Sequence, residues 1–163
     1  MIEIRNLEEN EYEFLLDMLY ESIHIPENKP TREELLNLPH IRKYHENWGR
    51  EGDQALIAID EENQKVGAVW YRLFEENNKG YGYVDDNTPE LGIAVVEKGR
   101  GKGIGTLLMN KIMQLAMTDG YKSISLSVDP DNRNAVHIYN KLGFQEYGIS
   151  GTSITMVYRC SKH

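Results

Sequence analysis

Cysteine is almost absent from this sequence, because the only one among its 163 residues is Cys160. A single thiol cannot close a disulfide within the chain, which excludes the small secreted domains that depend on such bonds. Long hydrophobic runs are missing too: no apolar stretch approaches the roughly 20 residues of a membrane-spanning helix, and the N-terminus carries no signal-peptide pattern. We therefore expect a reduced, cytoplasmic protein with no membrane partner.

Basic residues are few for a protein that would bind nucleic acid. The chain has 18 Lys and Arg against 26 Asp and Glu, a net charge of −8, whereas nucleic-acid binding rests on basic patches. The negative charge is compatible with cationic acceptors such as amines, and equally with a role in solubility. The five histidines show no metal-ligand spacing and no His-Glu-x-x-His motif occurs, so we expect no metal site.

The chain does contain enough apolar material, 40% of its residues, for one domain covering residues 1–163. Its most informative stretch is 89–117. Residues 91–96 are apolar and rich in β-branched side chains, which predicts a buried strand, and apolar residues at helical spacing predict a helix over 104–117. Between them lies a turn that reads Lys-Gly-Arg-Gly-Lys-Gly-Ile-Gly.

This turn has the features of an anion site. Gly101, Gly103 and Gly105 carry no side chain that would keep a ligand from the backbone, and glycine tolerates positive φ. The helix that follows offers unpaired N–H groups and the positive end of its dipole, which suits a phosphate or pyrophosphate. Arg100 and Lys102 add two cations. Many glycine-rich turns are only turns, so the glycines alone leave that reading open.

Two common nucleotide-binding patterns do not fit the turn. The mononucleotide P-loop requires Ser or Thr after its lysine, and Lys102 is followed by Gly103. The dinucleotide fingerprint ends on a glycine that would fall on Ile104 or Thr106, depending on where it starts. What remains is an Arg-x-x-Gly-x-Gly run between a strand and a helix.

A second patterned segment covers residues 123–144. Alternating apolar residues predict a strand over 123–128, followed by a turn at 129–132 and a helix that Gly143 closes. Its helix carries the pattern Asn132-x-x-Ala135-x-x-x-Tyr139-x-Lys141-x-Gly143-Phe144. We expect the strands near Leu91 and Ile124 to be parallel and joined by a right-handed crossover through the helix 104–117.

The Arg-x-x-Gly-x-Gly run resembles the acetyl-CoA pyrophosphate loop of the GNAT superfamily of N-acetyltransferases, and the second segment looks like the part that follows it in that family. The resemblance implies an α/β (mixed α+β) fold of three layers, with a central mixed, mostly antiparallel sheet and helices on both faces. It also implies transfer of an acetyl group from acetyl-CoA to a primary amine by direct attack in a ternary complex, without a metal. The acceptor would be a small amine or an amino acid-like compound.

The resemblance further implies roles for individual residues. Tyr139 would be the acid that protonates the leaving thiolate, with core packing and a hydroxyl bonded to backbone as its alternative. Glu90 would take the ammonium proton directly or through water, although a water chain alone is sufficient in many members. The cofactor-binding residues would be Ile93, Ala94, Val95, Arg100, Gly101, Lys102, Gly103, Ile104, Gly105, Thr106 and Asn132, the last with a plain helix cap as its alternative.

Other readings stay open at this stage. The same fold could be a non-catalytic acetyl-CoA sensor or scaffold, or could acetylate a protein N-terminus or lysine, and it allows a homodimer. The fold would bring Trp70 and Arg72 near the acceptor, and Asp85 and Asp86 could attract its ammonium group, but sheet packing and turn formation are the favoured interpretations of these residues. The remaining patterns predict strands over 2–5, 54–60, 66–74, 144–150 and 153–159, helices over 8–23 and from a Thr31 capping box, and a third helix over 41–48 after a break at Pro39.

Overall fold

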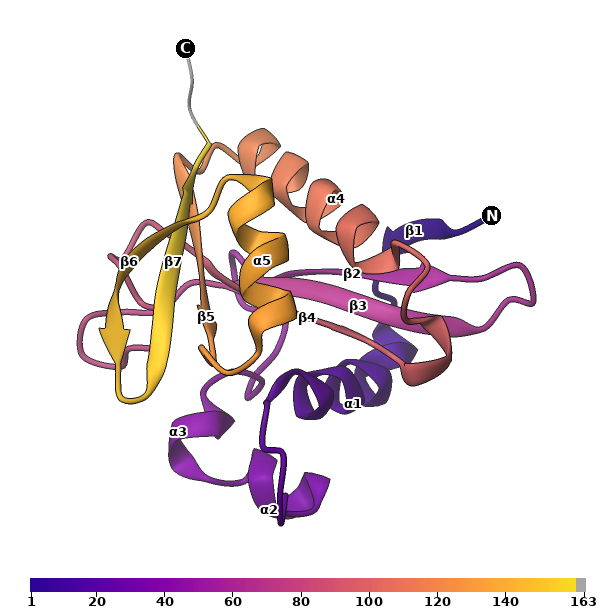
Figure 1. Ribbon diagram of the computed structural model, residues 1–163, viewed down its shortest axis with the longest axis horizontal. Helices are drawn as coiled ribbons and strands as arrows, with labels where there is room; N and C mark the ends of the chain where they lie inside the picture. Colours follow the sequence, from indigo (N-terminus) through magenta and orange to yellow (C-terminus); the bar gives the residue numbers. More distant parts are fainter. Residues whose placement is uncertain (161–163) are drawn as a thin grey trace. The chain divides into compact units, whose positions relative to one another are not determined.

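The computed structural model describes residues 1–160 and holds seven strands in one mixed sheet (Figure 1). The strand order is β1 (Glu3–Asn6), β2 (Gln54–Ile59), β3 (Lys65–Arg72), β4 (Glu90–Val95), β5 (Ser123–Val128), β7 (Ser153–Arg159) and β6 (Gln145–Ser150). Strands β4 and β5 are parallel, whereas β1 with β2, β5 with β7 and β6 with β7 are antiparallel. The fold class predicted from the sequence, mixed and mostly antiparallel, is therefore confirmed.

The chain divides into two compact units. One unit comprises residues 1–70 and 92–112, and the other comprises 71–91 and the chain from 113 onward. The elements that lie wholly or partly in the first unit are β1 (Glu3–Asn6), η1 (Glu9–Glu11), α1 (Tyr12–Ser22), α2 (Arg32–Leu36), α3 (Pro39–Arg42), β2 (Gln54–Ile59), β3 (Lys65–Arg72), β4 (Glu90–Val95), η2 (Glu97–Gly99) and α4 (Ile104–Thr118). Of these, β3, β4 and α4 extend into the second unit.

Helices pack on the strands of the first unit. In Figure 1, α1 lies below β2 and β3, and the first turns of α4 lie above them. The approach of α4 to β3 is close at Gly67, where an added Cβ would meet a methyl of Leu108 at 3.1 Å. Leu108 and Ile57 of β2 are both fully buried, so apolar residues at the predicted periodicities form this core.

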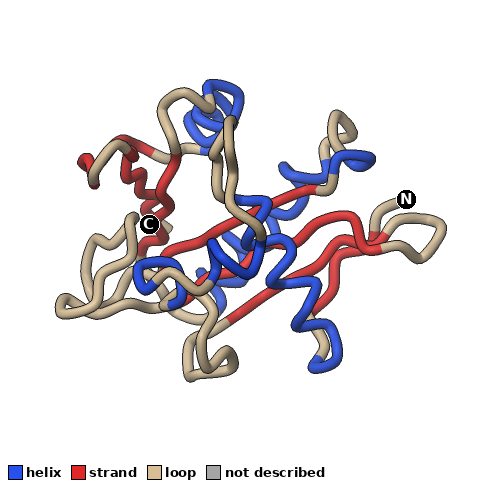
Figure 2. The backbone as a smooth tube through the Cα atoms, turned by 90° about the horizontal axis from the view of Figure 1, so that it is seen from below, coloured by secondary structure: helices blue, strands red, loops and turns tan. Residues whose placement is uncertain are grey.

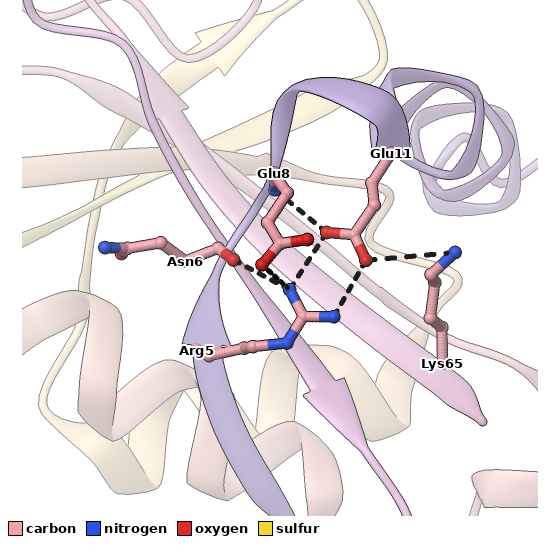
Figure 3. A network of polar contacts seen from close by, with 5 residues as sticks. All are labelled: Arg5, Asn6, Glu8, Glu11 and Lys65. Carbon is pink, nitrogen blue, oxygen red and sulfur yellow. Dashed lines mark hydrogen bonds and ion pairs between the residues drawn. The ribbon is translucent and has the colours of Figure 1, made fainter. Parts of the chain in front are cut away.

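A partly buried ion pair links the first strand to the first helical turn (Figure 3). The two terminal guanidinium nitrogens of Arg5 donate to the carboxylate of Glu11, at 3.0 and 2.8 Å, and the Glu8 N–H donates to the same carboxylate at 2.8 Å. Lys65 approaches Glu11 to 3.8 Å, and Glu11 is only 5% exposed. Arg5 therefore ties β1 to the start of the helical region.

The prediction of a third helix over 41–48 is wrong in position. Thr31 does form the capping box, because its hydroxyl accepts from the Glu34 N–H while Glu34 accepts from the Thr31 N–H. Pro39, however, begins α3 at its first turn, and residues 43–49 form turns. Proline suits that position because its missing N–H has no helical acceptor there in any case.

The second unit contains β5 (Ser123–Val128), α5 (Arg133–Leu142), β6 (Gln145–Ser150) and β7 (Ser153–Arg159). Strand β7 pairs with β5 from Ser123–Arg159 to Val128–Ile154, and with β6 through a register shift between Glu146 and Gly148. Figure 2 shows substantial loop segments beside the helices and strands, and one long loop spans residues 73–89. The strands and the helix of this unit match the predicted segments to within two residues.

Candidate active site

The glycine-rich turn lies in the first unit, between η2 and α4. Gly101 and Gly103 both have a φ of +78°, and a Cβ built on either would meet no atom within 4 Å. Their backbone therefore needs glycine for its conformation, and the space beside it is open. Gly105 has no positive φ, and its added Cβ would only touch a Val95 methyl at 4.0 Å. Of the three predicted glycines, Gly101 and Gly103 are thus required by their backbone conformation, and Gly105 is not.

The turn leads directly into the N-terminus of α4. The Leu107 N–H donates to the Gly103 carbonyl at 3.1 Å, which is the first bond of the helical ladder. The N–H groups of Ile104, Gly105 and Thr106 precede that bond, as the first N–H groups of any α-helix do. These groups and the helix dipole make the end of the turn attractive to an anion.

The two predicted cations of the turn differ in their surroundings. Arg100 donates from Nε to the Val95 carbonyl at 3.1 Å, and its guanidinium lies 3.8 Å from the Glu21 carboxylate of α1. Its side chain is 58% exposed, and Lys102 is exposed as well. Arg100 thus joins the turn to the end of β4 and to α1, whereas Lys102 lies on the surface.

The register of β3 and β4 decides which way the backbone of β4 points. The Val96 N–H donates to the Val66 carbonyl at 2.9 Å, and Gly92 contacts the ring of Trp70, so a step forward along β3 is a step back along β4. In an antiparallel ladder, alternate residues turn both polar groups toward the partner strand. Residues 92, 94 and 96 therefore face β3, and the backbone groups of Ile93 and Val95 point away from it.

The second unit carries Tyr139 on α5. Its ring lies 6.0 Å from that of Phe144, which packs against Tyr158 of β7 at 5.6 Å. Burial raises the pKa of the Tyr139 hydroxyl to about 12. Within residues 1–160 this hydroxyl makes no hydrogen bond. The Tyr139 side chain is half-buried, and its hydroxyl is protonated at neutral pH. In the described part of the chain the hydroxyl is not bonded to a backbone acceptor, as it would be if it served packing alone.

Asn132 caps α5. Its side-chain oxygen accepts from the Ala135 N–H at 3.4 Å, and the residue lies outside the helical conformation. The cap gives Asn132 a local structural role that its sequence position alone predicts.

Glu90 opens β4 in the second unit and is 5% exposed. It lies opposite Ser125 of β5 in the parallel pairing. A Cβ built on Gly82 would lie 3.1 Å from the Glu90 carboxyl carbon, so the 73–89 loop packs directly against this side chain. Sequence patterns did not single out Gly82, because only the long-range contact reveals why a glycine is needed there.

The acidic residues of the same loop act as turn formers. The Asp85 carboxylate accepts from the Thr88 hydroxyl and the Asn87 N–H, both at 2.9 Å. The Asp86 carboxylate accepts from the Tyr83 hydroxyl at 2.5 Å and the Glu76 N–H at 3.1 Å. These contacts account for both aspartates as loop structure.

The described part of the chain contains neither of two further kinds of feature, a metal-binding cluster and a membrane-spanning helix. Residues 1–160 hold no group of three or more His, Cys, Asp or Glu side chains placed to bind a metal ion. None of the helices in that range combines the length and apolarity that crossing a bilayer requires. The candidate site residues lie in two sets. The turn and the end of β4 belong to the first unit, and Glu90, Asn132 and Tyr139 belong to the second.

Comparisons with known proteins place this geometry in context. The model of the acetyltransferase (GNAT) family matches residues 12–144. Streptothricin acetyltransferase A of Bacillus subtilis is 28% identical over 131 residues, which cover 77% of this chain and 68% of that protein. Mycothiol acetyltransferase of Corynebacterium kroppenstedtii is 32% identical over 97 residues, 60% of this chain. The chain spans only 26% of the length of that second relative.

Solved structures agree with the fold. Ribosomal-protein-alanine N-acetyltransferase from Brucella melitensis superposes with a TM-score of 0.69 at 21% identity, over 96% of this chain and 99% of that one. A mutant spermidine/spermine N-acetyltransferase from Vibrio cholerae gives a TM-score of 0.66 at 20% identity, over 99% and 96%. At these identities the likeness concerns the fold alone.

Proposed function

Because the chain belongs to the acetyltransferase (GNAT) family, we propose that it transfers an acetyl group from acetyl-CoA to a primary amine by direct attack within a ternary complex. The acceptor is a small amine or an amino acid-like compound. Two relatives are named as acetyltransferases of the small molecules streptothricin and mycothiol, which supports a small-molecule acceptor without selecting one. Residues 1–163 act as one catalytic domain in a cytoplasmic setting.

The observation that carries the proposal is the turn before α4. Gly101 and Gly103 adopt positive φ with open space beside them, directly ahead of the helix N-terminus. A pyrophosphate needs such close access to backbone N–H groups, and the groups from Gly101 to Thr106 would hold it. Arg100 and Lys102 would lie near the phosphates.

The pantetheine would lie along the outward backbone of β4. The N–H and C=O groups of Ile93 and the N–H of Val95 point away from β3, toward the place of an added extended chain, while the Val95 C=O accepts from Arg100. The Ala94 N–H is directed toward β3, so the Val95 N–H is the better donor to the thioester carbonyl. Such a donor can contribute about 3–4 kcal/mol by stabilising the oxyanion of the tetrahedral intermediate.

The chemistry needs one base and one acid. A deprotonated amine attacks the thioester carbon, a tetrahedral oxyanion forms, and the carbon–sulfur bond then breaks. Tyr139 gives its proton to the departing thiolate, and its raised pKa keeps that proton in place at neutral pH. Glu90, buried under the loop, would take the ammonium proton through an intervening water, and Asn132 would bond the pantetheine besides capping α5.

The proposal is tested by thiol release from acetyl-CoA against a panel of amines that includes polyamines, amino acids and short peptides. A calorimetric titration with CoA runs in parallel. Turnover with a small amine supports the proposal, and turnover only with peptides selects protein acetylation instead. CoA binding without any turnover would favour a sensor or scaffold, and absence of CoA binding contradicts the reading of the turn. Light scattering on the same sample tests the predicted homodimer.

A further inference from the structure

Two loop residues of the second unit, Tyr81 and Gly82, are fixed to the sheet by buried hydroxyl groups; we call this pair the strap. The Ser125 hydroxyl of β5 donates to the Gly82 carbonyl at 2.6 Å, and the Thr155 hydroxyl of β7 donates to the Tyr81 carbonyl at 3.1 Å. Ser125 is fully buried and Thr155 is 4% exposed. Hydrogen bonds shielded from water in this way hold a loop more firmly than exposed ones.

The strap leaves no room for a side chain at its second residue. A Cβ on Gly82 would lie 2.8 Å from the Leu126 carbonyl carbon, 3.0 Å from the Leu126 oxygen and 3.1 Å from the carboxyl carbon of Glu90. Gly82 therefore lies directly against the backbone of β5 and against the Glu90 carboxyl group. Glu90 is confined by backbone, which cannot yield as a flexible side chain would.

Arg72, at the end of β3, is a buried cation in the same unit. Val66 pairs with Val96 and Trp70 contacts Gly92, and this register, continued by two residues along each strand, would place Arg72 opposite Glu90. Residues opposite one another in an antiparallel pair share a face of the sheet. Arg72 is 1% exposed, and charged side chains are rarely buried so deeply unless an opposite charge compensates them.

We propose that the strap and Arg72 are positioning elements for Glu90: Arg72 supplies the opposing charge, and Gly82 fixes the place of the carboxyl group. This inference rests on the proposed acetyl transfer, in which Glu90 takes the ammonium proton. A base that relays a proton through one water must hold its oxygen at hydrogen-bond distance from that water, so a shift of a few tenths of an ångström matters. Neither Gly82 nor Arg72 touches the substrate in this scheme.

The test is a double-mutant cycle between Gly82→Ala and Glu90→Gln, read as kcat and as KM for acetyl-CoA. Gly82→Ala should lower kcat about tenfold in the Glu90 protein and less than about twofold in the Glu90→Gln protein, because a misplaced base matters only when the base is present. KM for acetyl-CoA should stay within about twofold throughout. Gly148→Ala is the matched control, since a Cβ there meets no atom within 4 Å.

Circular dichroism and urea unfolding establish that each variant is folded. If Gly82→Ala does not fold, Thr155→Val takes its place in the cycle, because it removes one hydroxyl that fixes the strap, with Thr152→Val in the exposed turn as its control. Arg72→Lys, which keeps the charge, should retain more kcat than Arg72→Met. An equal loss of kcat in both Glu90 backgrounds, or wild-type kcat in a folded Gly82→Ala protein, overturns the inference. Failure of the wild-type protein to turn over any amine is a different result and refutes the acetyl transfer itself.

Discussion

The indole ring of Trp70 fills the space in which a side chain at Gly92 would lie. A Cβ added to Gly92 would be 2.7 Å from two ring carbons of Trp70 and 2.8 Å from the ring nitrogen. Trp70 is 3% exposed, so this ring packs against the strand β4 rather than presenting itself to a ligand. The ring covers β4 at the point where the proposed thioester-binding residues begin.

We expect Gly92→Ala to destabilise the protein by about 1–3 kcal/mol, because the ring must move from a well-packed position. Urea unfolding followed by circular dichroism measures this. The cost should fall in a Trp70→Leu background, where the smaller side chain leaves room for the methyl group. A Gly92→Ala protein with unchanged stability would show that the ring adapts freely. Gly148→Ala, which adds a methyl in open space, is the control.

The sequence predicted the elements of this fold well because their signals are local. Alternation over 123–128, helical spacing over 104–117 and the Thr31 capping box each depend on residues close together in the chain. The error at Pro39 has the same origin: proline both ends and begins helices, and only the tertiary context selects between these.

The candidate site was predictable only where a motif carries it. The turn residues and Tyr139 were proposed from their motifs, whereas the enclosure of Glu90 could not be predicted in this way. Gly82, Ser125 and Thr155 are far apart in the sequence, and each is an ordinary residue in its own segment. Their common role depends on which backbone each approaches, which no local pattern encodes.

The turn before α4 can be tested with two glycines of equal conformation. Gly103→Ala and Gly120→Ala each add a Cβ at positive φ, +78° and +93°, in open space. Both should therefore cost a similar, small amount of stability, about 1 kcal/mol. Only Gly103→Ala should weaken CoA binding, by at least about tenfold, since only its methyl occupies the space proposed for the pyrophosphate. Equal CoA affinity of the two variants in calorimetry would refute the loop assignment.

The Arg5–Glu11 pair should make stability depend on acid pH. The Arg5 hydrogen bonds hold the pKa of Glu11 below its ordinary value of 4.5. A carboxylate with a lowered folded pKa stabilises the protein above its unfolded pKa, and that contribution is lost as the pH falls through the folded value. Glu11→Gln should therefore cost about 1–3 kcal/mol at pH 7, and the difference from wild type should shrink below pH 4.5.

The control for this pair is a surface ion pair of the same kind. Glu13 bonds Arg32 at 2.6 Å but is 76% exposed, so Glu13→Gln should cost less than about 0.5 kcal/mol at any pH. Urea unfolding between pH 3 and pH 7 measures both variants. A pH-independent cost of Glu11→Gln would mean that packing, not charge, accounts for it.

Tyr139→Phe separates the acid from the cofactor clamp. The substitution removes only the hydroxyl oxygen, and within residues 1–160 that oxygen makes no hydrogen bond, so no protein acceptor is left unsatisfied. The ring contacts with Phe144 should persist and the free energy of unfolding should change by less than about 1 kcal/mol. CoA affinity should be unchanged, because the substitution leaves the proposed pyrophosphate-binding turn intact. We expect Tyr139→Phe to lower the rate of acetyl transfer: kcat should fall by about 10²–10³-fold if this hydroxyl protonates the thiolate. A more acidic thiol leaves as the thiolate without needing a proton from an acid. Tyr139→Phe should therefore lose less activity with acetyl thioesters of such thiols than with acetyl-CoA. Equal losses for both donors, or a kcat like that of the wild type, would assign Tyr139 to packing, and the leaving thiolate would then take its proton from water.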